Sequence, residues 1–240
     1  MRRYFKLSLI ALFFASLTAR SQSSYFTGAF PTIDHSGDIT NKLGYGLYYF
    51  GAFPLVNLKT PNITKDANFL LFYSEQSLSY KLKDKFSLTG SYVYQRANAV
   101  YDNYVNENRA YVQAKYKHSV NRINLTHRVR FDARFIQNRI TNTTPFTHRV
   151  RYLFGIDLPI NNKFYFTMYE EAFFNTVNNA SPVYNENWAN ASLGIKLNEK
   201  NKMEAGILYI TWNTGGNNWF NQYYLQLAWI SHLDFRKNKT

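Results

Sequence analysis

Histidine, serine and carboxylate side chains are the residues of this sequence that could carry out acid–base or nucleophilic chemistry. Nucleophilic catalysis needs a base within hydrogen-bond reach of the nucleophile and a third group that orients the base. The sequence has no G-x-S-x-G motif, and no Asp or Glu stands at a suggestive offset from a Ser and a His. We therefore predict no catalytic residue and interpret every histidine as a polar rim or turn residue: His35, His118, His127, His148 and His232.

The sequence also lacks the motifs of a metal site or a cofactor site. There is no cysteine, no H-x-x-x-H spacing and no acidic loop dense enough for Ca²⁺, which needs clustered carboxylates and a glycine at the bend. The stretch "NTGGNN" (Asn213–Asn218) is followed by neither a helix nor a lysine, so it is not a phosphate-binding loop. We predict no metal site and no cofactor.

Arginines form the most regular pattern of charged residues. In "INLTHRVRFDARFIQNRI" (Ile123–Ile140), Arg128, Arg130 and Arg134 alternate with Val, Phe and Ala, and "HRVRYLFGIDL" (His148–Leu158) repeats the pattern. A period of two indicates extended backbone with the arginines on one face and the apolar residues on the other. One face therefore requires water or carboxylates, and the other requires an apolar medium.

Charged side chains recur at the same parity along most of the other predicted strands. We expect them to line the interior of a barrel and to pair across it. For the adjacent Glu170 and Glu171, we expect one to neutralise lumen arginines and the other to lie on the outside or near a rim. The predicted lumen charge network consists of Lys115, Lys117, Arg128, Arg130, Asp132, Arg134, Arg149, Arg151, Asp157, Glu171, Lys196 and Glu204.

The composition narrows the class of protein. The chain has 240 residues, 18% of them aromatic, with 20 Tyr and 20 Phe, which favour strands and suit a membrane-facing surface. The formal net charge of +13 includes four basic residues within the first 21, which leaves +9 spread through alternating segments. Because no basic run is massed in one place, nucleic-acid binding is not expected.

The first residues indicate export. "MRRYFKLSLIALFFASLTARSQS" has a basic start, an apolar run that is too short to span a bilayer, and small residues around a cleavage site at Ala19–Ser21. We predict a cleaved signal peptide over residues 1–21. The predicted location is the outer membrane of a Gram-negative bacterium.

Period-two segments and turn signals predict ten strands joined by connections of alternating length. Short connections such as "INNK" (Ile160–Lys163) alternate with long polar ones such as "NTVNNASPVYNEN" (Asn175–Asn187). An outer-membrane barrel has short periplasmic turns, long extracellular loops, an even number of strands and both ends in the periplasm. The predicted strands lie near residues 43–54, 67–81, 85–97, 108–118, 122–137, 145–159, 163–175, 187–198, 202–213 and 221–235.

The predicted fold is therefore all-β: an antiparallel, up-and-down transmembrane β-barrel of about ten strands (10–12) in meander order. We place the barrel at residues 43–235 and a C-terminal tail at 236–240. Residues 22–42 form an extra strand, a periplasmic stub or a plug, and the sequence does not decide between these. A barrel of this size has a lumen that side chains fill or nearly fill, so a general porin is excluded.

Several of these segments resemble one bacterial family. "LSYKLKDKFSLTGSYVYQR", "NENRAYVQAKYKHSVNRINLTHRVRFDARFI", "FTHRVRYLFGIDLPI", "FYFTMYEEAFFNT" and "YYLQLAWISHLDF" are similar, in the same order, to the family called domain of unknown function 2490. The resemblance covers roughly Ala67 to Phe235. It implies an exported, barrel-forming outer-membrane protein and brings no activity, ligand or catalytic residue.

The predicted role is that of an outer-membrane barrel with a narrow charged lumen: structural, adhesive or a narrow conduit. The expected partners are outer-membrane lipid and lipopolysaccharide, and the barrel-assembly machinery during biogenesis; the oligomeric state stays open. One alternative is an outer-membrane lipid-modifying hydrolase, which requires a Ser or an acid to meet a His at one rim. Another is a soluble periplasmic lipocalin-like or β-sandwich binding protein, in which the apolar face would point inward.

Overall fold

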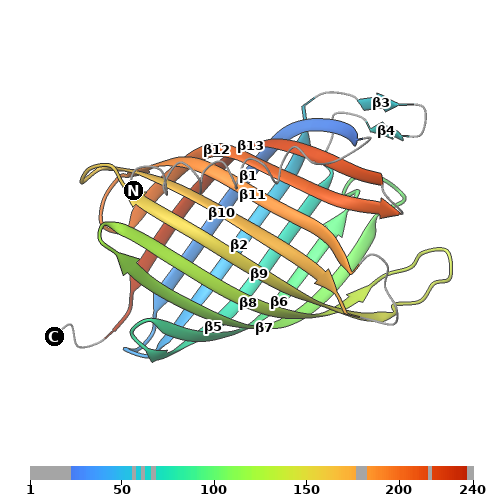
Figure 1. Ribbon diagram of the computed structural model, residues 1–240. Coiled ribbons are helices and arrows are strands. Elements are labelled where there is room, and N and C mark those ends of the chain that lie inside the picture. Colours follow the sequence, from blue (N-terminus) through green and yellow to red (C-terminus); the bar gives the residue numbers. More distant parts are fainter. Residues whose placement is uncertain are drawn as a thin grey trace.

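The protein is a closed β-barrel in which the strands follow each other around the wall (Figure 1). The computed structural model describes residues 23–55, 58–60, 63–65, 69–176, 183–215 and 218–236. The predicted signal peptide, residues 1–21, lies outside the described residues, as does most of the predicted tail. Within the described part, no helix is long and apolar enough to cross a membrane.

Thirteen strands are present in the described residues. Eleven form the barrel, and β3 and β4 form a separate two-stranded sheet within the connection between β2 and β5. The strands are β1 (Ser23–Asp38), β2 (Leu43–Pro54), β3 (Leu58–Thr60), β4 (Ile63–Lys65), β5 (Leu71–Lys83), β6 (Phe86–Ala97), β7 (Val105–Val120), β8 (Ile123–Ile136), β9 (Phe146–Pro159), β10 (Phe164–Asn175), β11 (Tyr184–Lys196), β12 (Asn201–Gly215) and β13 (Asn218–Asp234).

The predicted fold class is confirmed, with one difference in strand number. All ten predicted strands are present within a few residues of their expected bounds, as β2 and β5 to β13. The eleventh is β1, which pairs with β2 on one side and with β13 on the other. Of the alternatives left open for residues 22–42, the structure contains a strand, so the barrel wall includes residues that we set apart from it.

An odd number of strands changes how the barrel closes. In a meander of eleven alternating strands the first and last run in the same direction, so β1 and β13 pair in parallel while the other barrel pairs are antiparallel. The predicted even number of strands, with both chain ends on one side, is therefore wrong. β1 begins at the end of the barrel that carries the long connections, and β13 finishes at the opposite end.

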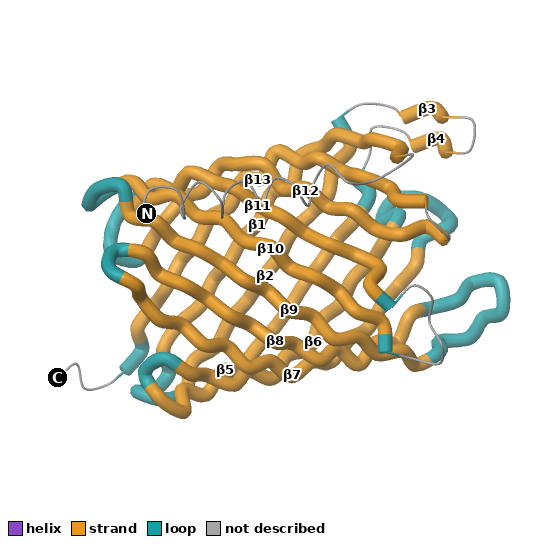
Figure 2. Tube along the Cα trace, viewed as in Figure 1, coloured by secondary structure: helices purple, strands orange, loops and turns teal. Residues whose placement is uncertain are grey.

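We call these two ends the loop end and the turn end. Figure 2 shows that the connections are confined to the two ends and that strands form the wall between them. At the turn end, Asn side chains close short turns: Asn161 Oδ1 accepts hydrogen bonds from the backbone N–H of Lys163 and Phe164, both at 2.8 Å. Asn198 makes the same arrangement with Lys200 and Asn201 at 2.9 Å. Such Asx turns fix the chain reversal locally, so the short connections need no tertiary support.

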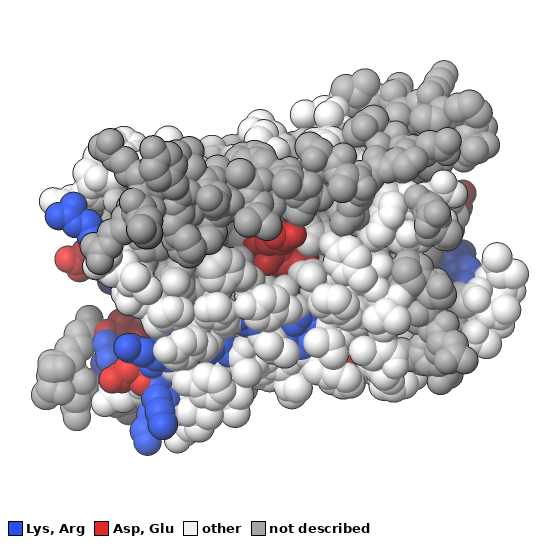
Figure 3. All heavy atoms as spheres, in the orientation of Figure 1, with Lys and Arg blue, Asp and Glu red and all other residues white. Residues whose placement is uncertain are grey.

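The outer surface of the barrel is apolar. Outward side chains on the strands are large and exposed, among them Leu193 (52%), Leu225 (48%), Leu227 (48%) and Trp229 (49%). On the face seen in Figure 3, most of the described surface between the two ends is uncharged, with small acidic and basic patches near the middle. A soluble barrel or sandwich requires the reverse arrangement, because a contiguous apolar surface of this extent would face water.

The interior has two parts. One is the charge network of β7 to β10, which is described below. The other is aromatic and was not predicted: Phe50 stacks on Phe30 with ring centroids 4.5 Å apart and on Tyr73 at 4.4 Å. Trp188 from the opposite wall packs edge-on against Phe30 and Phe50. Side chains therefore fill the lumen at this level, in a barrel well below the size of about 16 strands at which aqueous channels form.

Candidate functional site

The strand register explains why the charged residues meet. Residues 128, 130, 132 and 134 of β8 point inward together because side chains alternate along a strand. In the ladder, Arg130 lies opposite Arg151 of β9, and Arg134 lies opposite Arg109 of β7. Like charges directly opposite each other repel, so this wall of the barrel needs carboxylates that reach in from other positions.

Glu171 of β10 provides the first of these carboxylates. Arg151 donates two parallel hydrogen bonds to it, from Nε to Oε1 and from Nη2 to Oε2, both at 2.8 Å. Arg128 Nη2 lies 2.7 Å from the same Oε1. Glu171 is 2% exposed. One buried carboxylate thus neutralises part of the charge of two guanidinium groups from neighbouring strands, in the bidentate geometry that Arg favours.

Glu107 of β7 forms an equivalent group nearer the loop end. It accepts from Arg134 Nε at 2.7 Å and Arg134 Nη2 at 2.9 Å, and from Arg109 Nε at 2.8 Å. Arg109 is 2% exposed. Neither Glu107 nor Arg109 was among the predicted members of the network. Glu107 stands in the polar run "DNYVNEN" (Asp102–Asn108), which is typical of a loop, whereas the strand begins at Val105. Arg109 lies within the predicted strand 108–118, but its partner Glu107 does not.

Asp132 joins the two groups. Its Oδ2 accepts from Arg149 Nε at 2.9 Å and lies 3.8 Å from Arg109 Nη1 and 3.7 Å from Arg151 Nη1. Arg149 also donates to Glu186 Oε2 at 2.9 Å. Asp132 is fully buried. The carboxylate at the centre of three arginines makes the two groups one continuous network.

Glu75 connects this network to the aromatic part of the lumen. Its carboxylate accepts from the hydroxyls of Tyr73 at 2.7 Å and Tyr111 at 2.5 Å, and Arg130 Nη1 lies 3.6 Å from it. Arg130 also stacks over the Tyr111 ring at 3.7 Å and donates to Gln113 Oε1. The charged and aromatic parts therefore pack as one filled interior.

The network holds six arginines against five carboxylates, and a guanidinium cannot lose its proton at any ordinary pH. Such a set of fixed, mutually paired charges suits structure rather than proton transfer. Seven of the twelve predicted residues come together here: Arg128, Arg130, Asp132, Arg134, Arg149, Arg151 and Glu171. The members that the sequence did not reveal are Glu75, Glu107, Arg109, Gln113 and Glu186.

The other five predicted residues lie apart from the network. Asp157 accepts from Thr167 Oγ1, and Glu204 accepts from the Tyr165 hydroxyl, both at 2.7 Å. In the part of the chain that the structure describes, these two carboxylates form no ion pair, and neither do Lys115, Lys117 and Lys196, which lie toward the turn end. The adjacent Glu170 points outward, where Asn187 Nδ2 donates to it at 3.1 Å.

Four of the histidines lie on the outer face: His35, His118, His127 and His148. His127 stacks against His118, with ring centroids 5.5 Å apart, and its Nδ1 lies 2.9 Å from the Tyr152 hydroxyl. His148 packs against Phe131. Among the described residues, no group of three or more His, Asp or Glu could hold a metal ion.

His232 has different surroundings, at the mouth of the lumen at the turn end. Its Nδ1 lies 3.0 Å from Ser36 Oγ, and its Nε2 lies 3.2 Å from Asp38 Oδ2. Ser36 and His232 are 196 residues apart and are direct partners in the parallel β1–β13 ladder. The sequence offers no sign of this contact, because it depends on the register in which the barrel closes.

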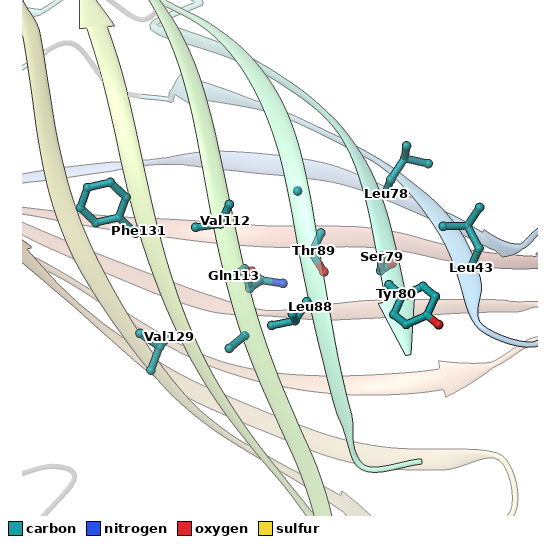
Figure 4. A pocket seen from close by; sticks show the side chains of 12 residues that line it. Leu43, Leu78, Ser79, Tyr80, Leu88, Thr89, Val112, Gln113, Val129 and Phe131 are labelled. Atoms are coloured by element: carbon teal, nitrogen blue, oxygen red, sulfur yellow. The ribbon is translucent and has the colours of Figure 1, made fainter. Parts of the chain in front are cut away.

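A hollow on the described surface lies outside the barrel. It is an open apolar depression over β5 to β8, and its walls include Leu78, Leu88, Val112, Val129 and Phe131 (Figure 4). Gly90 lies in its floor, where a Cβ would meet nothing within 4 Å. The depression is part of the apolar outer face and brings no charged side chains together.

Fold and site together define the class: a closed, up-and-down β-barrel with an apolar outer wall and a filled, charge-paired lumen. The chain belongs to the family described as "Protein of unknown function (DUF2490)", whose model matches residues 60–221. The match starts before Ala67 and ends before Phe235, the two ends of the region that resembles this family. No curated protein matches the chain significantly.

Replacing Glu171 by Gln tests the network. The change leaves Arg128 and Arg151 buried without their carboxylate, so we expect the free energy of unfolding in detergent to fall by about 3–5 kcal/mol. Glu170→Gln is the matched control on the adjacent outward position and should change it by less than about 1 kcal/mol. Urea titration of the folded band on unboiled gels measures both; equal effects of the two variants would contradict the structural role of Glu171.

Proposed function

We propose that the protein is an outer-membrane β-barrel with a sealed lumen, which acts as a scaffold that displays its long connections outside the cell. The observation that carries this proposal is the polarity of the wall: paired charges lie inside and large apolar side chains lie outside. In water this arrangement would expose an extended apolar surface, whereas in a bilayer that surface contacts hydrocarbon. The soluble binding protein that the sequence left open needs the opposite polarity.

The distribution of aromatic residues supports the membrane location. Barrel strands of 12 to 17 residues are about 40–55 Å long at roughly 3.3 Å per residue, enough to cross a tilted apolar band of about 25 Å. Exposed aromatic side chains occur near both ends of the strands, as expected where rings meet the headgroup region. Those near the turn end include Tyr80, Tyr116, Phe164 and Trp229, and those near the loop end include Phe53, Phe72, Phe135 and Phe146.

The filled interior favours a scaffold over a conduit. At one level Phe30, Phe50 and Tyr73 of neighbouring strands stack inside the lumen, and Trp188 of β11 packs against the first two. At the charged level, Arg149 and Arg151 lie over the Phe173 ring at 4.7 and 4.4 Å. An ion would have to displace rings or break buried charge pairs to pass, and both are costly.

The N-terminal pattern and the connections give the orientation. The basic and apolar start of residues 1–21 fits a cleaved signal peptide. Short connections are typical of the periplasmic side and long ones of the outside. In this orientation the turn end faces the periplasm, the mature chain starts at the external surface, and lipid and lipopolysaccharide surround the wall.

Fractionation of the native host tests the location. We expect the protein in the outer-membrane fraction, with a band on SDS gels that migrates differently before and after boiling, because a closed barrel resists SDS until it is heated. Recovery in the soluble periplasm, without a heat-modifiable band, would contradict the membrane assignment.

Conductance across a planar bilayer tests the sealed lumen. The wild-type protein should give no steady current, since aromatic rings fill the barrel. The double variant Phe30→Ala/Phe50→Ala removes two stacked rings and should give rare current steps, whereas Ile33→Ala/Tyr49→Ala, outward on the same two strands, should give none. Steady conductance by the wild-type protein would overturn the proposal and make it a conduit.

A further inference from the structure

The parallel contact between β1 and β13 places a hydroxyl, an imidazole and a carboxylate in one line. Ser36 Oγ lies 3.0 Å from His232 Nδ1, and His232 Nε2 lies 3.2 Å from Asp38 Oδ2. A carboxylate only accepts hydrogen bonds, so Asp38 selects the tautomer in which Nε2 carries the proton. Nδ1 is then left as an acceptor for the Ser36 hydroxyl. This is the order of nucleophile, base and orienting group that serine hydrolysis requires.

The three residues are open to solvent, unlike the Ser–His pair on the opposite face of the same two strands. The side chains of His232 and Asp38 are 51% and 32% exposed. On the outer face, His35 Nδ1 lies 2.6 Å from Ser231 Oγ, but Ser231 is only 7% exposed and the second ring nitrogen of His35 meets the Tyr45 hydroxyl instead of an acid. Of these two serines, Ser36 is the one that combines a base, an oriented ring and access for a substrate.

Basic residues surround this mouth. Arg236 lies two residues beyond the end of β13. Its Nε and Nη2 donate hydrogen bonds to the Asp234 carboxylate at 2.8 and 2.7 Å, and it also interacts electrostatically with Asp38. Basic residues in and beside the turns of this end outnumber the acidic ones there, which are Asp38, Asp84, Asp157, Glu199, Glu204 and Asp234. The basic residues are Lys42, Lys81, Lys83, Lys85, Lys117, Arg122, Lys163, Lys196, Lys200, Lys202 and Arg236.

We propose that Ser36, His232 and Asp38 form a hydrolytic site for carboxylic esters that carry an anionic group. Ser36 Oγ attacks the ester carbonyl while its proton moves to His232 Nδ1. The alcohol leaves with that proton, and an acyl-serine remains. Water then attacks the acyl-serine with His232 as the base, which releases the carboxylic acid and restores the Ser36 hydroxyl.

The surroundings of the site set its expected efficiency and specificity. Ser36 lies in a strand that is paired on both sides, so its backbone N–H groups are committed to the ladder and do not form an oxyanion hole. The developing oxyanion therefore depends on the basic side chains around this mouth, of which Arg236, paired with Asp234, is one. We therefore expect slow turnover and a preference for anionic over neutral esters.

Active-site labelling tests the assignment on the full chain, folded in detergent and shown to be folded by its heat-modifiable band. A fluorophosphonate probe should attach to Ser36, as mapped by mass spectrometry. Ser36→Ala should abolish the adduct, and His232→Gln should slow labelling by about 100-fold or more because the general base is lost. Ser231→Ala and His35→Gln, which remove the neighbouring pair, should leave labelling unchanged.

Substrate assays on the same preparation distinguish the source of the ester. Hydrolysis of anionic phospholipid in mixed micelles identifies a membrane lipid as the substrate, and hydrolysis of a soluble anionic nitrophenyl ester alone identifies a water-soluble one. A folded wild-type protein that is not labelled, or an adduct that persists in Ser36→Ala, overturns the site. Because the gel band reports the barrel independently, that result leaves the scaffold proposal standing.

Discussion

The arginines of β7, β8 and β9 impose the constraint on which the rest of the structure depends. Six guanidinium groups lie inside the barrel and stay charged under all ordinary conditions, so each of them needs an acceptor at close range. The carboxylates that meet this need come from β5, β7, β8, β10 and β11, which ties distant strands to a single register. With its charges turned inward, the wall is left with apolar side chains outside, and the proposed membrane location rests on this polarity.

Closure by an odd strand has a second set of consequences. β1 separates β2 from β13 and brings two segments almost two hundred residues apart into a parallel ladder. Pro31 is tolerated there because the pairing with β2 is interrupted at Phe30 and Pro31. The same ladder places Ser36 beside His232, so the proposed hydrolytic site lies where β1 and β13 close the barrel. Charge pairing fixes the register of the wall, and the closing strand positions the residues of that site.

The sequence predicts the wall well and the closure poorly, for physical reasons. Strands β2 and β5 to β13 carry a clear period of two and local turn signals, both of which act over a few residues. β1 carries Gly28, Pro31 and Gly37, and its strand conformation depends on a partner at the other end of the chain. Glu107 was missed because its strand starts inside a polar run, and without this carboxylate nothing in the sequence pointed to Arg109 as a member of the network. The Ser36–His232 contact follows from the closing register, which no local pattern encodes.

The central claim is that the apolar face meets hydrocarbon while the opposite face of each strand is sealed inside. Trp229 points outward and is 49% exposed, whereas Trp188 points inward against Phe30 and Phe50. Fluorescence of single-tryptophan variants in vesicles of acyl-brominated lipid compares the two directly. Strong quenching of Trp229 with little quenching of Trp188 is the predicted result. Equal quenching of both, or stronger quenching of Trp188, would contradict the assignment of the two faces.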